Sequence, residues 1–136
     1  MKAVDKKGRC YLWVTKNPLG TEVALTQETY ETHILRGHPN DKARKIVYPQ
    51  IKGIIEQPRF IYYDQQYEEN LRHRYLDFIH IQEYGRIFSL VIIVDTDRSP
   101  NEIVTWHIES NKNRLKTNGV VIYDSRQSNR SYSDLR

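Results

Sequence analysis

The chain has 136 residues, the usual size of one domain, and 38% of them are hydrophobic, which is enough for a small core and excludes disorder throughout. Its longest apolar run, residues 90–94, is much shorter than a membrane helix, so we expect no membrane association. Lys and Arg outnumber Asp and Glu by 21 to 17, and this net charge of +4 permits an anionic partner without requiring one. The single cysteine, Cys10, excludes an internal disulfide and a cysteine metal cluster. Together with the lack of a signal-peptide pattern, it predicts a reducing, cytoplasmic location.

The first elements predicted along the chain are a hairpin and a helix. Residues 10–15 and 21–25 favour strands, and residues 17–20 between them place Asn, Pro and Gly where a type I turn favours them. A helix follows over residues 27–36, because Thr26 is a suitable N-cap and acidic residues occupy the first turns. A glycine and a proline then stop it.

A second helical stretch begins at Asn40 or Asp41 and ends at Pro58. Pro49 lies inside it and lacks the N–H that a helix needs, so we expect a kink or two short helices near Tyr48. The apolar side chains after the proline share one face: Ile51, Ile54 and Ile55.

Beyond Pro58 the pattern changes to strands. These are predicted over residues 60–63, 72–82, 87–94, 102–109 and 120–123, with an acidic loop at 64–70 and a basic loop at 111–119. Residues 87–94 are apolar on both faces, so we expect them to form the central strand.

The strand at residues 102–109 has two different faces. Thr105, His107 and Glu109 alternate with a second set, which is Val104, Trp106 and Ile108. Because side chains of a strand alternate between faces, the second set is predicted in the core and the first on the opposite, polar face.

These elements predict an α+β domain. An N-terminal hairpin and two helical segments would pack on a curved, four- to five-stranded antiparallel sheet, with the helices on one face and solvent or a ligand on the other. Residues 1–124 would form this single domain, and residues 125–136, which lack apolar anchors, a mobile tail.

The first candidate site is at the end of the predicted first helix. His33 and Arg36 are three residues apart and share a helical face, and His38 follows the terminating glycine. Imidazoles exchange protons near neutral pH and a guanidinium binds phosphate oxygens, so these groups suit phosphoryl transfer without a metal. Basic groups at a helix C-terminus are also favoured by the helix dipole alone, which is the structural alternative.

A second candidate set lies on the strands. Arg72 and Arg74 open one strand, and Thr105 and His107 occupy the polar face of another. An ordinary solvated sheet face is the alternative interpretation. The basic loop adds further candidates for binding a phosphate backbone, which are Lys112, Arg114 and Lys116. None of the histidine spacings matches a metal-binding motif, so no metal and no cofactor is predicted.

In order, these motifs resemble those of the prophage-associated barnase/EndoU/colicin/RelE-like (BECR) nucleases. The segments that carry the resemblance span about residues 21–109: His33-Ile34, His38-Pro39, the Ile-rich helix 51–58, Arg74-Tyr75, the apolar strand 90–94 and the Thr-bearing strand 103–106. The resemblance implies an α+β fold with an antiparallel sheet and metal-independent cleavage of RNA, often in toxin or phage-conflict settings. Substrates would then be tRNA or mRNA, and an antitoxin or immunity protein would be the partner.

The leading hypothesis is a metal-independent endoribonuclease in which the 2′-hydroxyl attacks the adjacent phosphorus. His33 or His107 would act as base, and the other of these two or His38 as acid. The remaining candidates would stabilise the charged phosphorane-like oxygens: Arg36 or Arg74, with a hydrogen bond from Thr105. A non-catalytic RNA- or protein-binding module on the same fold, and an enzyme for another phosphodiester, remain alternatives.

Overall fold

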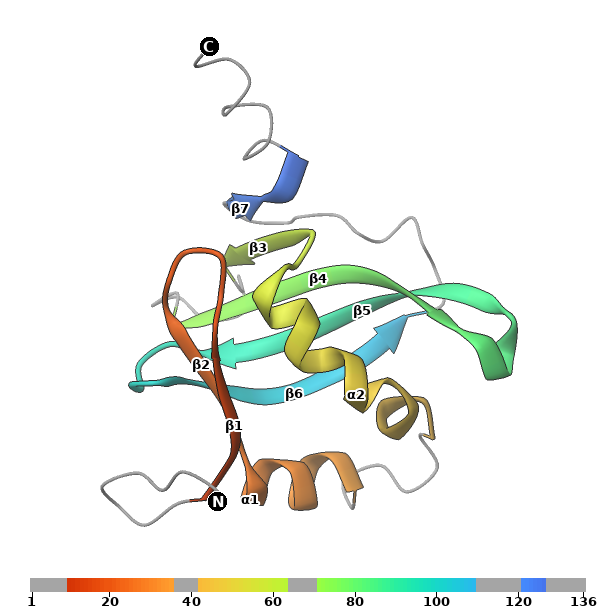
Figure 1. Cartoon of the computed structure of the whole chain (residues 1–136), viewed down its shortest axis with the longest axis horizontal. Helices are drawn as coiled ribbons and strands as arrows, with labels where there is room; N and C mark the ends of the chain where they lie inside the picture. Colours follow the sequence, from red (N-terminus) through yellow and green to blue (C-terminus); the bar gives the residue numbers. More distant parts are fainter. Residues whose placement is uncertain (1–9, 36–41, 64–70, 110–120, 127–136) are drawn as a thin grey trace.

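Seven strands and two helical regions make up residues 10–35, 42–63, 71–109 and 121–126, which are the residues that the computed structural model describes (Figure 1). In chain order the elements are β1 (Tyr11–Lys16), β2 (Glu22–Thr26), α1 (Gln27–Thr29), η1 (Tyr30–Leu35), α2 (Lys42–Glu56), β3 (Phe60–Tyr63), β4 (Arg72–Ile81), the short turn η2 (Gln82–Tyr84), β5 (Arg86–Asp95), β6 (Asn101–Glu109) and β7 (Val121–Asp124). The loops predicted at residues 64–70 and 111–119 and most of the predicted tail lie outside these ranges.

All seven strands form one sheet in the order β1-β2-β6-β5-β4-β3-β7. The α+β class and the central place of β5 are confirmed, whereas the prediction of four to five strands is wrong. Two pairings between distant parts of the chain enlarge the sheet. The N-terminal hairpin joins through β2, which runs parallel to β6 with Val23 opposite Asn101, so the prediction of an entirely antiparallel sheet is also wrong. At the other edge β7 pairs antiparallel with β3, with Ile61 opposite Tyr123.

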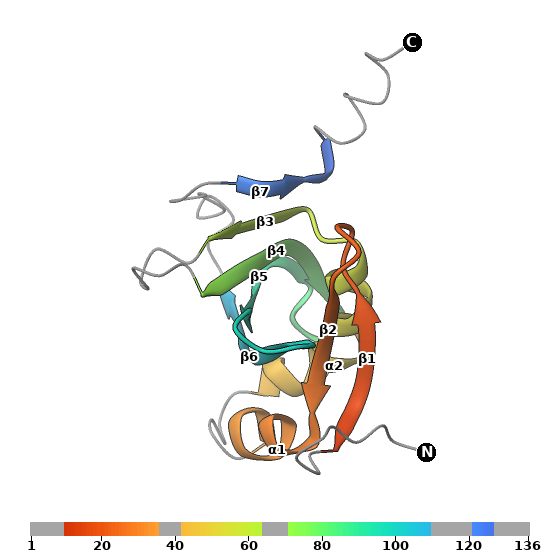
Figure 2. The same ribbon diagram turned by 90° about the vertical axis from the view of Figure 1, so that its left-hand side faces the viewer.

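The sheet curves around α2, which gives it an inner and an outer face (Figures 1 and 2). The inner face carries the main core, in which Tyr75, Ile92 and Trp106 are fully buried together with Ile51 and Ile55 of α2. The outer face carries a separate buried cluster, formed by Tyr62, Leu76, Val91 and Ile93. Both faces of the central strands are therefore occupied by apolar groups, as the sequence of β5 predicts.

Helix α2 is a single helix of 15 residues that runs through Pro49, so the alternative of two short helices near Tyr48 is wrong. Its buried residues lie on both sides of the proline, with Val47 before it and Ile51 after it. Packing of this apolar face on the sheet outweighs the local cost of the exposed proline. Within the described ranges, no helix is long and apolar enough to cross a membrane.

The helix after β2 begins where the sequence predicts. The side chain of Thr26 accepts a hydrogen bond from the backbone N–H of Thr29 at 3.1 Å, which is the expected N-cap. After α1 the helix widens into the π-type turns of η1. This helical region is held to the core by Tyr30, whose ring lies 4.5 Å from that of Tyr48.

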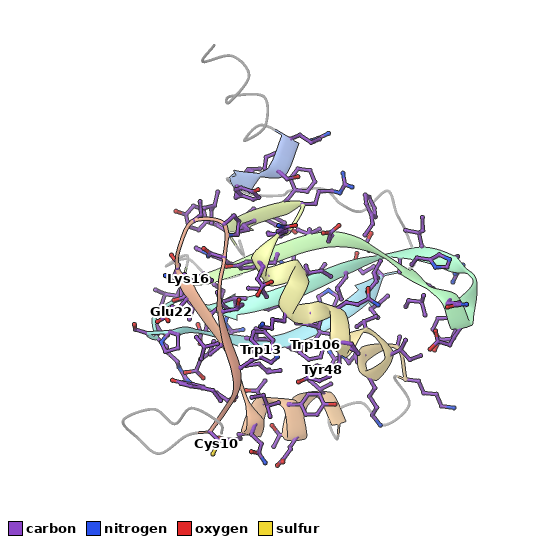
Figure 3. The ribbon with its side chains drawn as sticks, in the orientation of Figure 1. Cys10, Trp13, Lys16, Glu22, Tyr48 and Trp106 are labelled. Carbon is purple, nitrogen blue, oxygen red and sulfur yellow. The ribbon has the colours of Figure 1, made fainter. Side chains whose placement is uncertain are left out.

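Tyr48 in turn stacks on Trp106 of β6, and these two rings lie side by side in Figure 3. The Trp106 indole N–H donates to the backbone carbonyl of Arg44 at 3.0 Å. This contact fixes the start of α2 against the inner face of β6. Thr105 and His107, the sequence neighbours of Trp106, project from the opposite face.

Candidate functional site

Three of the predicted site residues lie together on the outer face of the sheet. Arg74 of β4 is opposite Ile93 of β5, and Ile93 is opposite Thr105 of β6. Since directly opposite residues of antiparallel strands project from the same face, Arg74 and Thr105 share one row across the sheet. His107 lies in the next row, opposite Val91. The alternation predicted for Thr105 and His107 is therefore confirmed.

A β-bulge interrupts this alternation just before Thr105. Ile93 is opposite Thr105, but the next residue of β5, Val94, is opposite Ile103, so Val104 is the extra residue. Val104 is only half-buried and packs against the outer-face cluster. Its predicted place in the main core is therefore wrong, because the extra residue changes the phase of the strand.

His107 is half-buried and faces charges of both signs. Its Nε2 lies 3.5 Å from Oε1 of Glu109. Burial lowers the pKa of His107 below its ordinary value of 6.5, and the positive charges of Arg74 and Arg44 lower this pKa further, while Glu109 raises it. The net direction is downward, so His107 is mostly neutral at pH 7 and can accept a proton.

The guanidinium of Arg74 has a different environment. It lies over the ring of Tyr62 at 5.9 Å from the centroid, and its buried Nε has no hydrogen-bond partner. Among the described residues no carboxylate forms an ion pair with it. Arg74 is therefore a cation held in place by an aromatic ring and by the strand, with donors available to an anion.

Arg72, predicted to bind substrate, lies on the same face as Arg74 but forms an ion pair with Asp95, Nε to Oδ1 at 3.8 Å. It lines a cavity of about 280 Å³ at this end of the sheet. Thr26, Glu102 and Val104 also line the cavity, so it adjoins the row that contains Thr105.

The remaining predicted residues are placed less completely. His33 belongs to η1, which contacts β6 and α2, but the position of its side chain is not described. The rest lie outside the described residues: Arg36, His38, Lys112, Arg114 and Lys116. Their convergence with Arg74, Thr105 and His107 therefore stays a prediction.

Sequence reasoning did not select three residues that shape this site. Glu109 was available from the alternation, since it is two residues after His107 on the same strand face. Tyr62 lies opposite Arg74, which only the pairing of β3 with β4 reveals. Arg44 comes from α2 and has no signal in the sequence that would connect it with His107.

Within the described ranges, no three side chains of His, Cys, Asp or Glu come close enough together to hold a metal ion. The polar groups that do gather are a guanidinium, a hydroxyl and an imidazole with its carboxylate neighbour.

The fold and site together define an α+β protein whose outer sheet face carries a guanidinium, a hydroxyl and an imidazole. The family model described as phage-Barnase-EndoU-ColicinE5/D-RelE like nuclease2 matches residues 4–124, which is most of the chain. The chain belongs to this family, as its motifs indicate. Searches of curated proteins and of solved structures each find no match.

Proposed function

We propose that the protein is an endoribonuclease that cleaves RNA by attack of a 2′-hydroxyl on the adjacent phosphorus. The observation that carries this proposal is the grouping of Arg74, Thr105 and a neutral His107 on one sheet face. Membership of a nuclease family supports a phosphodiester substrate. In RNA, the 2′-hydroxyl carries a proton that an imidazole base can remove.

In the proposed reaction, His107 removes the proton of the 2′-hydroxyl while the 2′-oxygen forms a bond to phosphorus. Arg74 binds the phosphate oxygens, whose negative charge increases, and the hydroxyl of Thr105 donates a hydrogen bond to one of them. The bond from phosphorus to the 5′-oxygen then breaks, and His33 or His38 supplies the proton to that oxygen. The products are a 2′,3′-cyclic phosphate and a 5′-hydroxyl.

The reaction so written needs no metal ion. A guanidinium and a hydroxyl perform the charge stabilisation that a divalent cation would otherwise supply, and neither group is a good ligand for a divalent cation. We therefore expect cleavage to continue unchanged in EDTA.

The test uses end-labelled RNA and three variants of the full chain. His107→Gln should lower the rate about 100- to 10,000-fold, since it removes the general base. Arg74→Gln should lower it about 100- to 1000-fold through lost charge stabilisation. His80→Gln is the matched control, because His80 is an exposed imidazole near the far end of β4 and should leave the rate unchanged.

The chemistry of the products decides between mechanisms. A 2′,3′-cyclic phosphate, and loss of cleavage when the 2′-hydroxyl at that position is replaced by hydrogen, are the expected results. RNA that stays intact while binding the protein would instead favour a non-catalytic module. Cleavage of the 2′-deoxy strand would contradict attack by the 2′-hydroxyl.

We also infer a toxic role, with tRNA or mRNA as the cellular substrate and an antitoxin or immunity protein as partner. The family description, which groups phage and colicin-like nucleases, supports this setting. Expression of the native chain in bacteria should stop growth and deplete one RNA class, whereas the His107→Gln variant should do neither. Normal growth with intact RNA would contradict the toxic role.

A further inference from the structure

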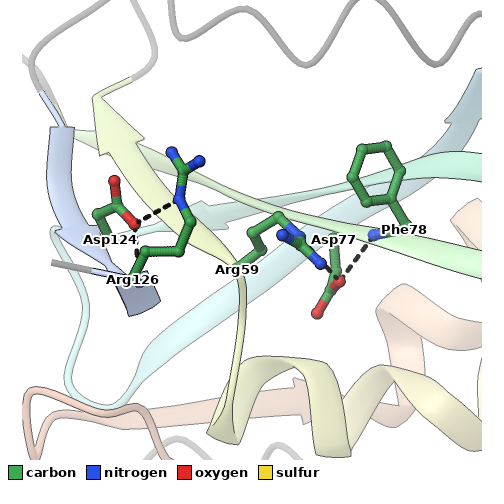
Figure 4. Close-up of polar contacts among 5 residues, drawn as sticks. All are labelled: Arg59, Asp77, Phe78, Asp124 and Arg126. Carbon is green, nitrogen blue, oxygen red and sulfur yellow. Dashed lines mark hydrogen bonds and ion pairs between the residues drawn. The ribbon is translucent and has the colours of Figure 1, made fainter. Parts of the chain in front are cut away.

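Two arginines at the β3–β7 edge of the sheet each contact an aspartate (Figure 4) and a phenylalanine ring. Arg59 lies over the ring of Phe78 at 5.0 Å from the centroid, and Arg126 lies over Phe60 at 5.2 Å. Each arginine also has its Nε near an aspartate. Arg59 Nε is 3.9 Å from Oδ1 of Asp77, and Arg126 Nε is 3.5 Å from Oδ1 of Asp124. We call these two units the arginine–phenylalanine pairs.

The rings of both pairs are on the outer face of the sheet, which also bears Arg74. Phe60 and Tyr62 are two residues apart on β3, and Phe60 is opposite Leu76, whose side chain belongs to the outer-face cluster. Phe78 is two residues further along β4 and so projects from the same face. With Arg74 over Tyr62, three aromatic rings beneath guanidinium groups follow one another along this face.

The spacing of these pairs suits an extended polynucleotide. Successive rows on one face of a sheet are about 6.6 to 6.8 Å apart along the strands, which is comparable to the phosphate spacing of an extended single strand. Asp124 contacts Arg126 at Nε, and the two outer nitrogens of Arg126 point away from this carboxylate (Figure 4). Arg59 Nε lies 3.9 Å from Asp77, so its contact with that carboxylate is looser. The outer nitrogens can contact a phosphate, and the plane of the guanidinium can stack on an unpaired base.

We propose that the arginine–phenylalanine pairs continue from Arg74 over Tyr62 as a track for single-stranded RNA, which extends along β4 to one side of the scissile phosphate. This inference rests on the proposed function, because it takes RNA as the ligand. A base in a duplex cannot stack on a guanidinium or a ring, so the track selects unpaired segments over paired ones. An aspartate and a ring restrain both Arg59 and Arg126 before binding, and a ring restrains Arg74, which reduces the entropy lost when a phosphate arrives.

The experiment measures binding of a 2′-O-methyl RNA strand, which cannot be cleaved by its own 2′-hydroxyl, as the salt concentration is raised. Each phosphate contact contributes about 0.7 to the slope of log affinity against log salt for single strands. The double variant Arg59→Gln with Arg126→Gln should therefore flatten this slope by about 1.4. A duplex of the same sequence should bind the native chain more weakly than the single strand does.

Arg86→Gln is the matched control. Arg86 also lies over a phenylalanine, Phe88, at 4.8 Å, but Phe88 belongs to the main core on the inner face. This variant removes the same charge and the same type of ring contact away from the track, and it should leave the slope unchanged. The lysine variants Arg59→Lys and Arg126→Lys keep the charge and should retain the native slope, which separates phosphate binding from a loss of folding.

An unchanged slope in the double glutamine variant, or equal affinity for duplex and single strand, would overturn the track. The same slope loss in Arg86→Gln would overturn it as well, since the effect would then follow net charge alone. Failure of the proposed function gives a different result. If the native chain binds single strands through Arg59 and Arg126 but leaves RNA uncut, the track stands and the nuclease activity does not.

Discussion

His107 is the residue whose charge state controls the proposed chemistry. Because its pKa is lowered in the folded chain, protonation is disfavoured there relative to the unfolded chain, where the pKa is near 6.5. The contribution of neutral His107 to the free energy of unfolding is therefore complete above pH 6.5. This contribution is lost as the pH falls from 6.5 toward the pKa of His107 in the folded chain. The same environment that keeps His107 available as a base thus makes the fold sensitive to acid.

The charges around His107 predict opposite effects for two substitutions. Glu109→Gln removes the carboxylate that raises the pKa of His107, so this pKa should fall further. Arg74→Gln removes a cation that lowers the same pKa, so the pKa should rise toward 6.5. An NMR titration of the His107 ring in each variant measures both shifts.

His80 is exposed and provides the control for folding in this experiment. At one fixed pH, its ring signals should have the same positions in the native chain and in both variants. Shifts of the His107 pKa in the same direction in the two variants would contradict the proposed arrangement of charges. In the Glu109→Gln variant, stability should also decline over a wider pH interval below 6.5 than in the native chain.

At the level of elements, Pro49 disfavours a helix at its position, but packing of α2 on the sheet outweighs this cost. Pro49 is exposed and lies inside a continuous helix, where it removes a hydrogen-bond donor. Alanine is about 3 kcal/mol more favourable than proline in a helix interior. Removing the proline also increases the conformational entropy of the unfolded chain, and this reduces the gain in stability by about 0.4 to 1 kcal/mol. Pro49→Ala should therefore raise the free energy of unfolding by about 2 kcal/mol.

Urea denaturation measures this change, and the exposed neighbour Gln50 provides the control. Gln50→Ala should alter the free energy of unfolding by less than about 0.5 kcal/mol, as is usual for surface positions. A decrease in stability for Pro49→Ala would mean that the helix geometry around residue 49 depends on the proline ring.

The elements themselves follow from local sequence more completely than the site does. Strand alternation identifies Thr105 and His107 as outward-facing residues, because that pattern is carried within one strand. The bulge at Val104 depends on how β6 pairs with β5, so the local pattern misplaces that residue. The contact of Arg74 with Tyr62 likewise depends on the register between β3 and β4.

At the scale of the whole molecule, the prediction failed on how the strands join, because the N-terminal hairpin is part of the main sheet. All seven strands are recognisable from the sequence, but a hairpin is compatible with either a separate position or a place in the main sheet. The parallel pairing of β2 with β6 joins residues about 80 positions apart, with Ala24 opposite Glu102. No local propensity encodes that contact, since it depends on what the hairpin meets when the chain packs.

One buried hydrogen bond connects the hairpin with the centre of the molecule. Asn17 lies in the turn between β1 and β2, and its side-chain amide donates to the hydroxyl of Tyr75 on β4 at 2.9 Å. Its side-chain oxygen accepts from the backbone N–H groups of Leu19 and Thr21. Asn17 therefore organises the turn and anchors it to the inner face of the sheet at the same time.

Asn17→Ala should lower the free energy of unfolding by about 2 to 3 kcal/mol, because it leaves the buried Tyr75 hydroxyl without this donor and removes the acceptor in the turn. Tyr75→Phe removes only the hydroxyl, so it should cost about 1 kcal/mol. In the double variant the Tyr75 hydroxyl is no longer left unpaired, and the combined loss should be smaller than the sum of the two single losses. Denaturation of the three variants gives this coupling energy directly. Strict additivity would show that the hairpin is held to the sheet by β2–β6 pairing and core packing alone, without the link from Asn17 to Tyr75.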